Sequence, residues 1–207
     1  MSGVNTATES YTTADGRTIG PVLMEMKNIT LRFGGVEAIK DISFDIREGE
    51  IRAIIGPNGA GKSSMLNVIS GFYVPQDGEV WYQGTRRPPM KPFQVAEQGI
   101  ARTFQNIALF EGMTVLDNVM TGRLTHMKTG MLAQAIWKGK AEREEVENRE
   151  VAEKIIDFLE IQAIRKTPVS RLPYGLKKRV ELARALAAEP SLLLLDEPMA
   201  GMNVEEK

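Results

Sequence analysis

The sequence predicts an α/β fold that opens with an antiparallel sheet, continues into a parallel sheet and is mainly helical in its second half. Apolar and polar residues alternate over residues 22–46, which is typical of half-buried antiparallel strands. A glycine-rich loop joins the apolar run 51–55 to a helical pattern at 64–70. The leucine run 192–195 is typical of a parallel strand that is covered on both faces.

The composition limits the class of protein and its partners. A chain of 207 residues can form one domain with a proper core, and its formal net charge of −1 provides no basic field for nucleic acid. Cysteine is absent, which excludes disulfides and thiolate metal sites within this sequence. No apolar run reaches the length of a membrane span and the N-terminus lacks a signal-peptide pattern, so we expect any membrane role to depend on a partner protein.

The N-terminal part is expected to contain a tail followed by a hairpin. Residues 1–20 are mostly small and polar, which predicts a flexible tail, with a functional arm as the alternative. Strands are expected at 22–33 and 36–46, on either side of a Gly-Gly turn. Phe33 ends the first strand, where its ring either stacks on an adenine base or closes the core of the hairpin. The spacing leaves both interpretations open.

The loop at residues 56–64 matches the pattern G-x-x-x-x-G-K-[ST]. Main-chain N–H groups of such a loop form a concave anion site, and the helix that follows directs its positive end toward the same phosphates. Lys62 is expected to reach the outer phosphates and Ser63 to bind Mg²⁺ through its hydroxyl. The alternative is a plain glycine-rich turn. The residues expected to bind nucleotide here are Gly56, Pro57, Asn58, Gly59, Ala60, Gly61, Lys62, Ser63 and Ser64.

Short elements are expected between this loop and the helical region. The pattern predicts strands at 79–82 and 100–103, with a short helix at 92–98 between them. Gln105 follows the second strand. Beside a phosphate site, its amide can reach the metal or the attacking water, whereas an ordinary strand-end amide bonds to the backbone. The chemistry of the residue does not decide between these roles.

Three helical patterns follow. Residues 114–121 have Thr114 as a candidate N-cap, and residues 140–160 combine an apolar stripe with a charged face. The third pattern runs from Gly175 to about residue 188, and its basic side chains either bind phosphate or form a solvated face. Those basic residues are Lys177, Lys178, Arg179 and Arg184. The single histidine, His126, has no acidic cluster beside it, so we expect no metal site there.

The leucine run ends in two adjacent carboxylates, Asp196 and Glu197. Carboxylates at the end of a buried strand are costly unless water or a cation meets them, and ligands of α/β sheets bind at this edge. Asp196 is therefore interpreted as a Mg²⁺ partner, and Glu197 as the residue that orients or deprotonates the attacking water. The alternative is a strand-end turn with solvated acids.

With these motifs in place, the chain resembles the nucleotide-binding subunit of an ABC transporter from about residue 22 onward. The resemblance implies a P-loop NTPase core with an N-terminal antiparallel β subdomain and a helical subdomain at about 106–180, all within a domain at 21–207. The matched motifs are the Walker A loop at 56–64, the Walker B strand with catalytic glutamate at 192–197, the Q-loop at Gln105, the aromatic A-loop position at Phe33, and the signature motif at 172–179.

A finer resemblance is to the ATPases of branched-chain amino acid (Liv-type) importers. It is carried by residues 101–106, 109–110, 113–119, 196–198 and 200–203. In that family two ATPase subunits lie under two permease subunits, and an extracytoplasmic binding protein delivers the solute. The resemblance implies a cytoplasmic subunit that is peripheral on the inner face of the cell membrane and binds ATP and Mg²⁺. It also implies that Lys62, Gln105 and Glu197 act in catalysis, that Ser63, Gln105 and Asp196 hold the metal, and that Gly175 meets the nucleotide of the opposite subunit.

The sequence departs from the family pattern at three points. Pro173 replaces the signature serine and supplies neither hydroxyl nor N–H. Asn203 stands where the D-loop often carries aspartate, and the sequence ends at Lys207, before the segment that carries the family's switch histidine and final core strands. We therefore expect a domain that is incomplete at its C-terminal side. Two alternative functions are a soluble ABC-type ATPase without a permease and a nucleotide-binding module that does not turn over.

Overall fold

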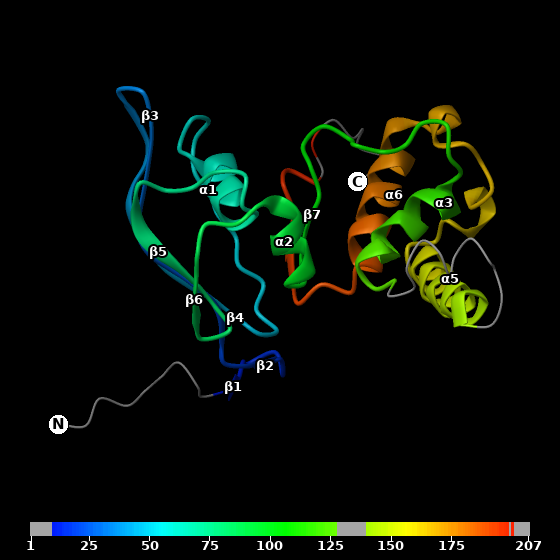
Figure 1. Cartoon of the computed structure of the whole chain (residues 1–207), viewed down its shortest axis with the longest axis horizontal. Coiled ribbons are helices and arrows are strands. Elements are labelled where there is room, and N and C mark those ends of the chain that lie inside the picture. The colour runs from blue at the N-terminus through cyan, green and yellow to red at the C-terminus, as the bar shows by residue number, and fades with distance from the viewer. Residues whose placement is uncertain (1–9, 128–139, 199, 201–207) are drawn as a thin grey trace. The chain divides into compact units, whose positions relative to one another are not determined.

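The structure is a computed structural model that describes residues 10–127, 140–198 and 200. The chain divides into two compact units, numbered 1–95 and 96–207, each of which is described by itself. Figure 1 gives the labels of the helices and strands. The predicted D-loop residue Asn203 and residues 1–9 of the predicted tail lie outside the described residues.

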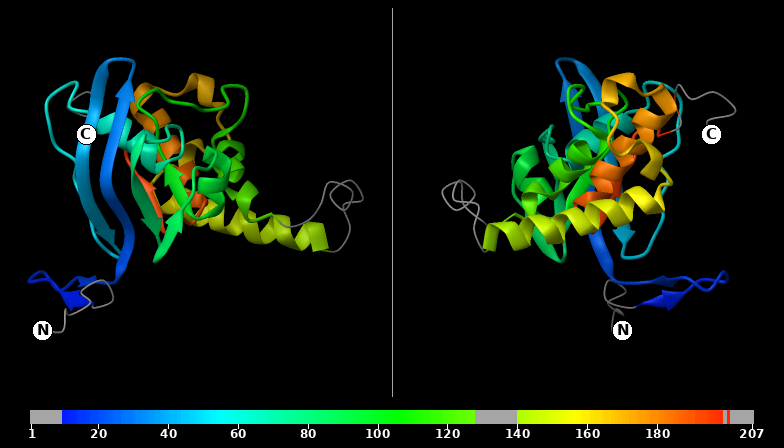
Figure 2. Two further views of the ribbon diagram at one scale, coloured as in Figure 1. Left: turned by 60° about the vertical axis from the view of Figure 1, so that its left-hand side comes forward. Right: turned by 90° about the vertical axis from the view of Figure 1, so that its right-hand side faces the viewer.

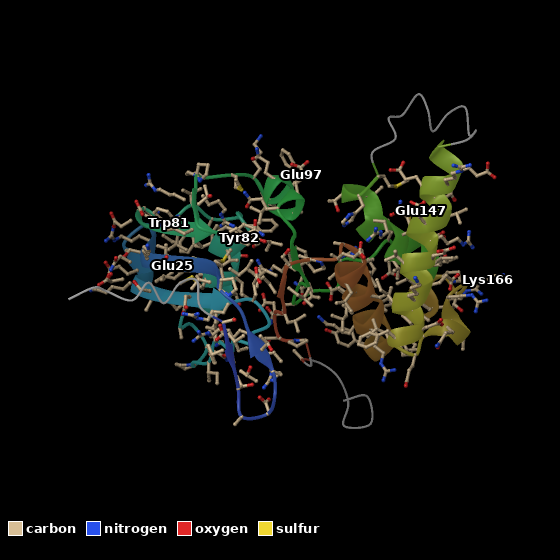
Figure 3. The ribbon with its side chains drawn as sticks, turned by 90° about the horizontal axis from the view of Figure 1, so that it is seen from below. Glu25, Trp81, Tyr82, Glu97, Glu147 and Lys166 are labelled. Atoms are coloured by element: carbon tan, nitrogen blue, oxygen red, sulfur yellow. The ribbon has the colours of Figure 1, made fainter. Side chains whose placement is uncertain are left out.

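The first unit is built on a four-stranded antiparallel sheet in the order β4-β3-β5-β6. Its strands are β3 (Val22–Phe33), β4 (Val36–Arg47), β5 (Asp77–Tyr82) and β6 (Thr85–Arg87). The predicted hairpin is confirmed, and Figure 2 shows β3 and β4 as a long twisted ribbon. Successive side chains of a strand point to opposite faces of the sheet. Tyr82 is therefore buried, whereas its neighbour Trp81 is only half-buried and is paired with Glu25 of β3 (Figure 3).

Two helices accompany this sheet. Helix α1 (Lys62–Ile69) follows the glycine-rich loop as expected and buries Met65, Val68 and Ile69. Helix α2 (Pro92–Glu97) is the predicted short helix with proline in its first turn, and it buries Val95. Of the strand–loop–helix arrangement expected for a phosphate loop, the loop and the helix after it are therefore present.

The predicted buried strand at residues 51–55 is wrong for this structure. These residues are in no strand, and Ile51 and Ile55 are 84% and 91% exposed. A parallel strand exists only when neighbouring strands accept and donate its main-chain hydrogen bonds. None of the sheets in the described part of the chain includes residues 51–55. The apolar run is therefore strand-like in composition, but it pairs with no strand in the described part of the chain.

A short hairpin precedes the main sheet, in a segment for which the sequence predicts a flexible tail. Strands β1 (Tyr11–Thr12) and β2 (Thr18–Ile19) pair antiparallel, and Ile19 is buried. The turn between them is closed by Arg17, whose guanidinium donates to Asp15 with the nitrogen and oxygen 2.7 Å apart. Local hydrogen bonds of a turn therefore order residues that have little apolar area to bury.

The second unit contains a parallel strand pair and a helical region. Strand β7 (Ile100–Arg102) pairs in parallel with β8 (Leu192–Leu194), with Ile100 opposite Leu192. This pairing confirms the parallel strand expected for the leucine run. It also brings together two segments that are about ninety residues apart in the sequence, so residues that follow each strand lie at the same sheet edge.

The helical region consists of α3 (Val115–Thr121), α5 (Lys140–Phe158) and α6 (Tyr174–Ala187), with short 3-10 helices at Gly122–Thr125, Gln162–Ile164 and Val169–Arg171. The three α-helices pack against one another (Figure 2). Thr114 caps α3 through a capping box with Asp117, as its position predicts. The buried apolar core of this region comprises Val115, Leu116, Val119, Ala152, Ile156, Ile161, Val169, Leu172, Val180, Ala183 and Ala187.

A buried arginine links the 3-10 helix at Gly122–Thr125 to the middle of α5 and to the C-terminal end of α6. Arg123 donates from Nε to the side chain of Asn148 on α5 over 2.8 Å, and from Nη1 to the carbonyl of Ala187 over 2.7 Å. The same Nη1 pairs with Glu189 over 2.6 Å. His126 lies three residues after Arg123 and is exposed, and its Nε2 lies 2.8 Å from the carbonyl oxygen of Ala188. In the described part of the chain it is therefore a surface side chain that forms a hydrogen bond with the main chain.

Candidate functional site

The phosphate loop depends on glycine at two positions with positive φ. Gly59 and Gly61 have φ values of 84° and 82°, a region that L residues other than glycine rarely adopt. At Gly61 a Cβ atom would lie 2.3 Å from the carbonyl oxygen of Ala38 on β4. The loop therefore packs so closely on the sheet that no side chain fits, whereas a Cβ at Gly59 would meet no atom within 4 Å.

Lys62 and Ser63 begin helix α1. The Nζ atom of Lys62 donates to the carbonyls of Gly56 and Pro57 of its own loop, 2.8 Å from each oxygen. These acceptors are neutral, and a phosphate oxygen forms a stronger, charge-assisted bond with an ammonium group. Ser63 is exposed at the first turn of the helix. The first unit thus presents an ammonium, a hydroxyl and a helix N-terminus along one short segment.

Phe33 lies at the end of β3 and is 46% exposed. Its ring meets that of Tyr73 edge to face, with centroids 5.0 Å apart and planes at 72°. Such a contact fixes the orientation of an aromatic ring while leaving a face available. The exposure favours the interpretation in which this ring binds a planar group over the one in which it closes the hairpin core.

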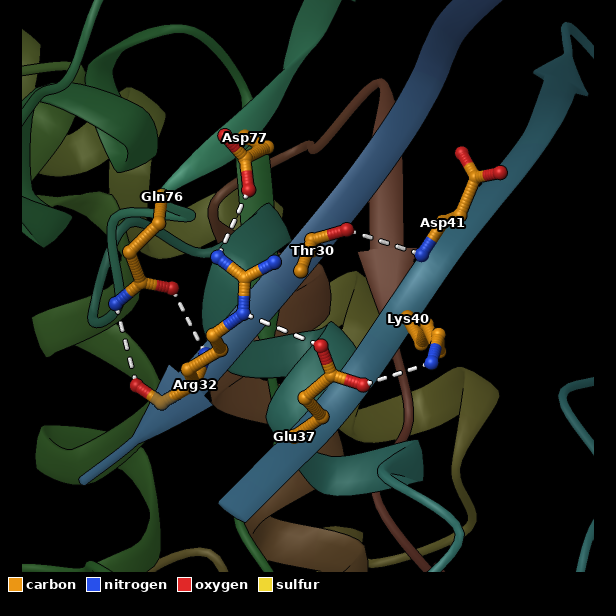
Figure 4. A network of polar contacts seen from close by, with 7 residues as sticks. All are labelled: Thr30, Arg32, Glu37, Lys40, Asp41, Gln76 and Asp77. Atoms are coloured by element: carbon orange, nitrogen blue, oxygen red, sulfur yellow. Dashed lines mark hydrogen bonds and ion pairs between the residues drawn. The ribbon is translucent and has the colours of Figure 1, made fainter. Parts of the chain in front are cut away.

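The backbone beside Phe33 is held by polar contacts (Figure 4). The side-chain amide of Gln76 accepts from the main-chain N–H of Arg32 over 2.8 Å and donates to its carbonyl over 3.2 Å. The Arg32 guanidinium pairs with Asp77 over 3.0 Å and with Glu37 over 3.3 Å. Hydrogen bonds from Lys40 and Arg32 hold the pKa of the Glu37 carboxyl below its usual range.

In the second unit, the ends of β7 and β8 bring Gln105 and Glu197 together. Gln105 Nε2 donates to Glu197 Oε2 over 3.1 Å. The amide oxygen of Gln105 is a hydrogen-bond acceptor, and an oxygen of this type can also bind a cation. Glu197 has φ of +47°, a left-handed conformation that is uncommon for glutamate and that typically costs about 1–3 kcal/mol.

Asp196 forms an ion pair with an arginine that the sequence patterns did not single out. Arg102, the last residue of β7, pairs with it over 2.9 Å, and the two side chains are only 8% and 9% exposed. A buried carboxylate requires such a partner, and the arginine provides it from the neighbouring strand. The parallel pairing of β7 with β8 sets Arg102 opposite Leu194, two residues before Asp196, so the pair depends on a strand register that the sequence pattern did not provide.

The donors expected to hold Mg²⁺ fit that ion by type. Ser63, Gln105 and Asp196 offer oxygen atoms, which Mg²⁺ prefers, and Mg²⁺ in nucleotide sites takes its remaining ligands from phosphate and water. In the part of the chain that the structure describes, no cluster of three or more His, Cys, Asp or Glu side chains is arranged to hold a metal alone. By type, these oxygen donors suit Mg²⁺ that is bound together with a nucleotide.

Helix α6 carries the signature residues at its start. Gly175 is buried in its first turn, and Pro173 at the N-cap position makes no side-chain cap. The sequence left two interpretations open for the basic residues of this helix, phosphate binding or a solvated face. Arg179 is exposed, as a solvated face predicts, whereas the other three bond to neighbouring segments of the protein. Lys178 and Arg184 donate to main-chain carbonyls of Phe104, Gln105 and Ala108, and Lys177 pairs with Glu111.

The comparison with protein families decides the classification. The family model described as ABC transporter matches residues 39–200. The chain belongs to the ABC transporter family. It is an ABC ATP-binding subunit with the P-loop NTPase fold, as the motifs predicted. Members of this family bind and hydrolyse ATP.

Named relatives of this ABC subunit include branched-chain amino acid transport proteins. It is 33% identical over 184 residues to the high-affinity branched-chain amino acid transport ATP-binding protein BraF of Pseudomonas aeruginosa, covering 89% of this chain and 72% of the relative. It is 32% identical over 184 residues to LivG of Escherichia coli K12, with the same coverage of 89% and 72%. The predicted resemblance to the Liv-type ATPases is therefore confirmed.

Solved structures agree with this classification. The ADP conformation of an ATP-binding cassette of an ABC transporter matches with a TM-score of 0.74 and 33% identity, covering 89% of this chain and 72% of that one. The cbiO1 protein of Clostridium perfringens, part of the ABC transporter complex cbiONQ, matches with a TM-score of 0.73 and 27% identity over 89% and 69% of the two chains. No helix among the described residues of this ABC subunit is long and apolar enough to cross a bilayer.

Proposed function

We propose that this chain is the ATP-hydrolysing subunit of an importer for branched-chain amino acids. The observation that carries the catalytic part is the contact between Gln105 and Glu197. It joins the Q-loop position to the second of the two carboxylates that follow the leucine run, over 3.1 Å. The solute class is supported by the 32% and 33% identities to LivG and BraF. In this proposal the subunit works in a pair, is bound by two permease subunits, and is peripheral on the inner face of the cell membrane.

The residues of the first unit bind the nucleotide in this proposal. Main-chain N–H groups of residues 56–64 bind the phosphates, with Lys62 moving its ammonium from loop carbonyls to phosphate oxygens. The Ser63 hydroxyl holds Mg²⁺, and the exposed ring of Phe33 stacks on the adenine. When bound, Mg²⁺ neutralises charge on the phosphate oxygens.

The residues of the second unit act on the attacking water and the metal. Glu197 orients the water and accepts its proton, and Gln105 positions this carboxylate through its amide while offering its oxygen to the metal. Asp196 would hold the metal directly or through water, and the Arg102 guanidinium, 2.9 Å away, supplies the opposite charge that this buried carboxylate needs. Gly175 and the uncapped start of α6 meet the nucleotide of the second ATPase subunit, where the helix dipole favours negative charge.

The test is Glu197→Gln, which preserves shape and removes the base. We expect phosphate release to fall by about 100-fold or more, because general bases contribute roughly 10²–10⁴-fold. Binding of ATP with Mg²⁺ should persist, and uptake of leucine, isoleucine and valine by vesicles carrying the permease should stop. Glu147→Gln, at an exposed position of α5, is the matched control (Figure 3). Normal uptake by the Glu197 variant would refute the role given to this residue.

A further inference from the structure

Helix α6 contains a buried ion pair that the proposed chemistry does not use. Lys178 and Glu181 lie one turn apart, with Nζ and Oε2 3.5 Å from each other, and their side chains are 4% and 1% exposed. Burying two charges costs free energy, and an apolar pair of similar size would often stabilise the fold as well or better. The presence of the pair therefore calls for a role beyond stability.

The contacts of the pair identify this role. Lys178 Nζ donates to the carbonyls of Phe104 and Gln105, 3.0 Å from each oxygen. Glu181 Oε1 accepts from the N–H of Phe104 over 3.1 Å. The last ladder bond before this point joins the Thr103 N–H to the carbonyl of Leu194. Beyond the end of β7, the main chain of the Gln105 segment is thus anchored by the two side chains on α6.

We propose that Lys178 and Glu181 are positioning residues that set where Gln105 stands relative to Glu197. The inference rests on the proposed ATPase function and extends it to two residues that touch neither nucleotide nor metal. Main-chain bonds at residues 104 and 105 fix the start of the Gln105 side chain, and its far end meets Glu197 over 3.1 Å. Lys178 lies one turn after Gly175, so the signature end of α6 and the Gln105 segment are held by one helix.

The first experiment separates positioning from stability. Lys178→Met leaves Glu181 as an unpaired buried charge and should lower Tm by about 5 °C or more. The double variant Lys178→Met/Glu181→Leu removes both charges and should recover most of this loss. Neither apolar side chain can bond to the main chain at Phe104 and Gln105. We therefore expect the double variant to keep a low kcat despite its recovered Tm.

The expected kinetic effect is specific. In the double variant kcat for ATP should fall by about 100-fold, which is the cost of a misplaced catalytic constellation. The Mg²⁺ concentration for half-maximal phosphate release should rise by about 10-fold, while KM for ATP stays within about 3-fold. The matched control is Arg165→Met/Glu153→Leu, which removes an ion pair of the same unit with side chains 44% and 34% exposed. A double variant with native kcat and Mg²⁺ dependence would show that the pair is only structural.

A second measurement does not require turnover. Because Glu181 accepts from the Phe104 N–H, hydrogen exchange of this amide in the full chain should be at least about 10-fold faster in the double variant than in the wild type. The Arg165/Glu153 control should exchange at the native rate. Equal Phe104 rates in the double variant and the wild type would overturn the anchoring. If the wild-type chain released no phosphate, the proposed function would fail, whereas faster exchange would still support the anchoring.

Discussion

At Gly61 the main chain of the phosphate loop lies against the carbonyl of Ala38, and the residue also has a left-handed φ of 82°. Gly59 has a similar φ of 84° but faces open space. The two glycines are therefore needed for different physical reasons. Gly59 needs backbone freedom only, whereas Gly61 needs backbone freedom and close approach to β4.

We predict that Gly61→Ala destabilises the chain more than Gly59→Ala does. Replacing a positive-φ glycine costs more than about 0.4–1 kcal/mol, the size of the entropic gain that a compatible Gly→Ala change brings. Gly61→Ala adds a clash with a main-chain carbonyl that cannot move freely, for a total of about 3 kcal/mol, within the upper range of single substitutions. Urea unfolding of both variants checks this, and equal losses would contradict the close packing of Gly61 on Ala38.

At the scale of elements, Arg123 connects the 3-10 helix after α3 to α5 and to the C-terminal end of α6. Its hydrogen bond to Glu189 lowers the pKa of that carboxyl, and burial opposes the effect only in part. The two ends of the pair differ in environment, because the Arg123 side chain is 7% exposed and that of Glu189 is 55% exposed. Solvent screening at Glu189 therefore limits what the pair contributes.

We predict that this contribution is present at neutral pH and is lost in acid. A carboxyl whose folded-state pKa lies below its unfolded value of about 4.3 stabilises the fold above that value. The stabilisation declines as the pH falls through the lower, folded-state pKa. Glu189→Gln should therefore cost up to about 1 kcal/mol at pH 7 and progressively less below about pH 4. Denaturant unfolding from pH 7 to pH 3 tests this, with Glu150→Gln as an exposed control on α5. A loss that grew on acidification would contradict the pKa direction.

At the scale of the whole molecule, the proposed site residues are divided between the two units. Phe33, Lys62 and Ser63 belong to residues 1–95, and the residues proposed to act on water and metal belong to residues 96–207. A ligand that binds only the folded chain stabilises it by mass action, whichever residues it contacts. Global unfolding is therefore a direct measure of nucleotide binding that does not depend on turnover.

We predict that ATP with Mg²⁺ at 100 times its Kd stabilises the chain by about 2.7 kcal/mol. For a chain of this length, that corresponds to a rise in Tm of roughly 5–10 °C. Lys62→Ala should abolish the rise because the phosphates lose their ammonium partner, while the Tm without nucleotide should change little. Lys154→Ala, at an exposed position of α5, should keep the full rise. A native shift in the Lys62 variant would show that nucleotide binds elsewhere.

The sequence by itself determined the motifs and most elements, because each depends on local pattern. The hairpin at Val22–Arg47, the capped helix after Thr114 and the parallel strand at Leu192–Leu194 follow from periodicity and capping chemistry. The phosphate loop and the acid pair were recognisable from residue type and spacing, and the family match agrees with them.

Only the tertiary structure decided which side chains meet across long distances in sequence. The Arg102–Asp196 pair, the Gln105–Glu197 contact and the anchoring of Phe104 by Glu181 join residues 77 to 94 positions apart. Residues 51–55 also show what sequence alone does not predict. An apolar run forms a strand only when neighbouring strands form hydrogen bonds with its backbone. Composition marks a segment as strand-like, but the hydrogen bonds that make it a strand come from elsewhere in the fold.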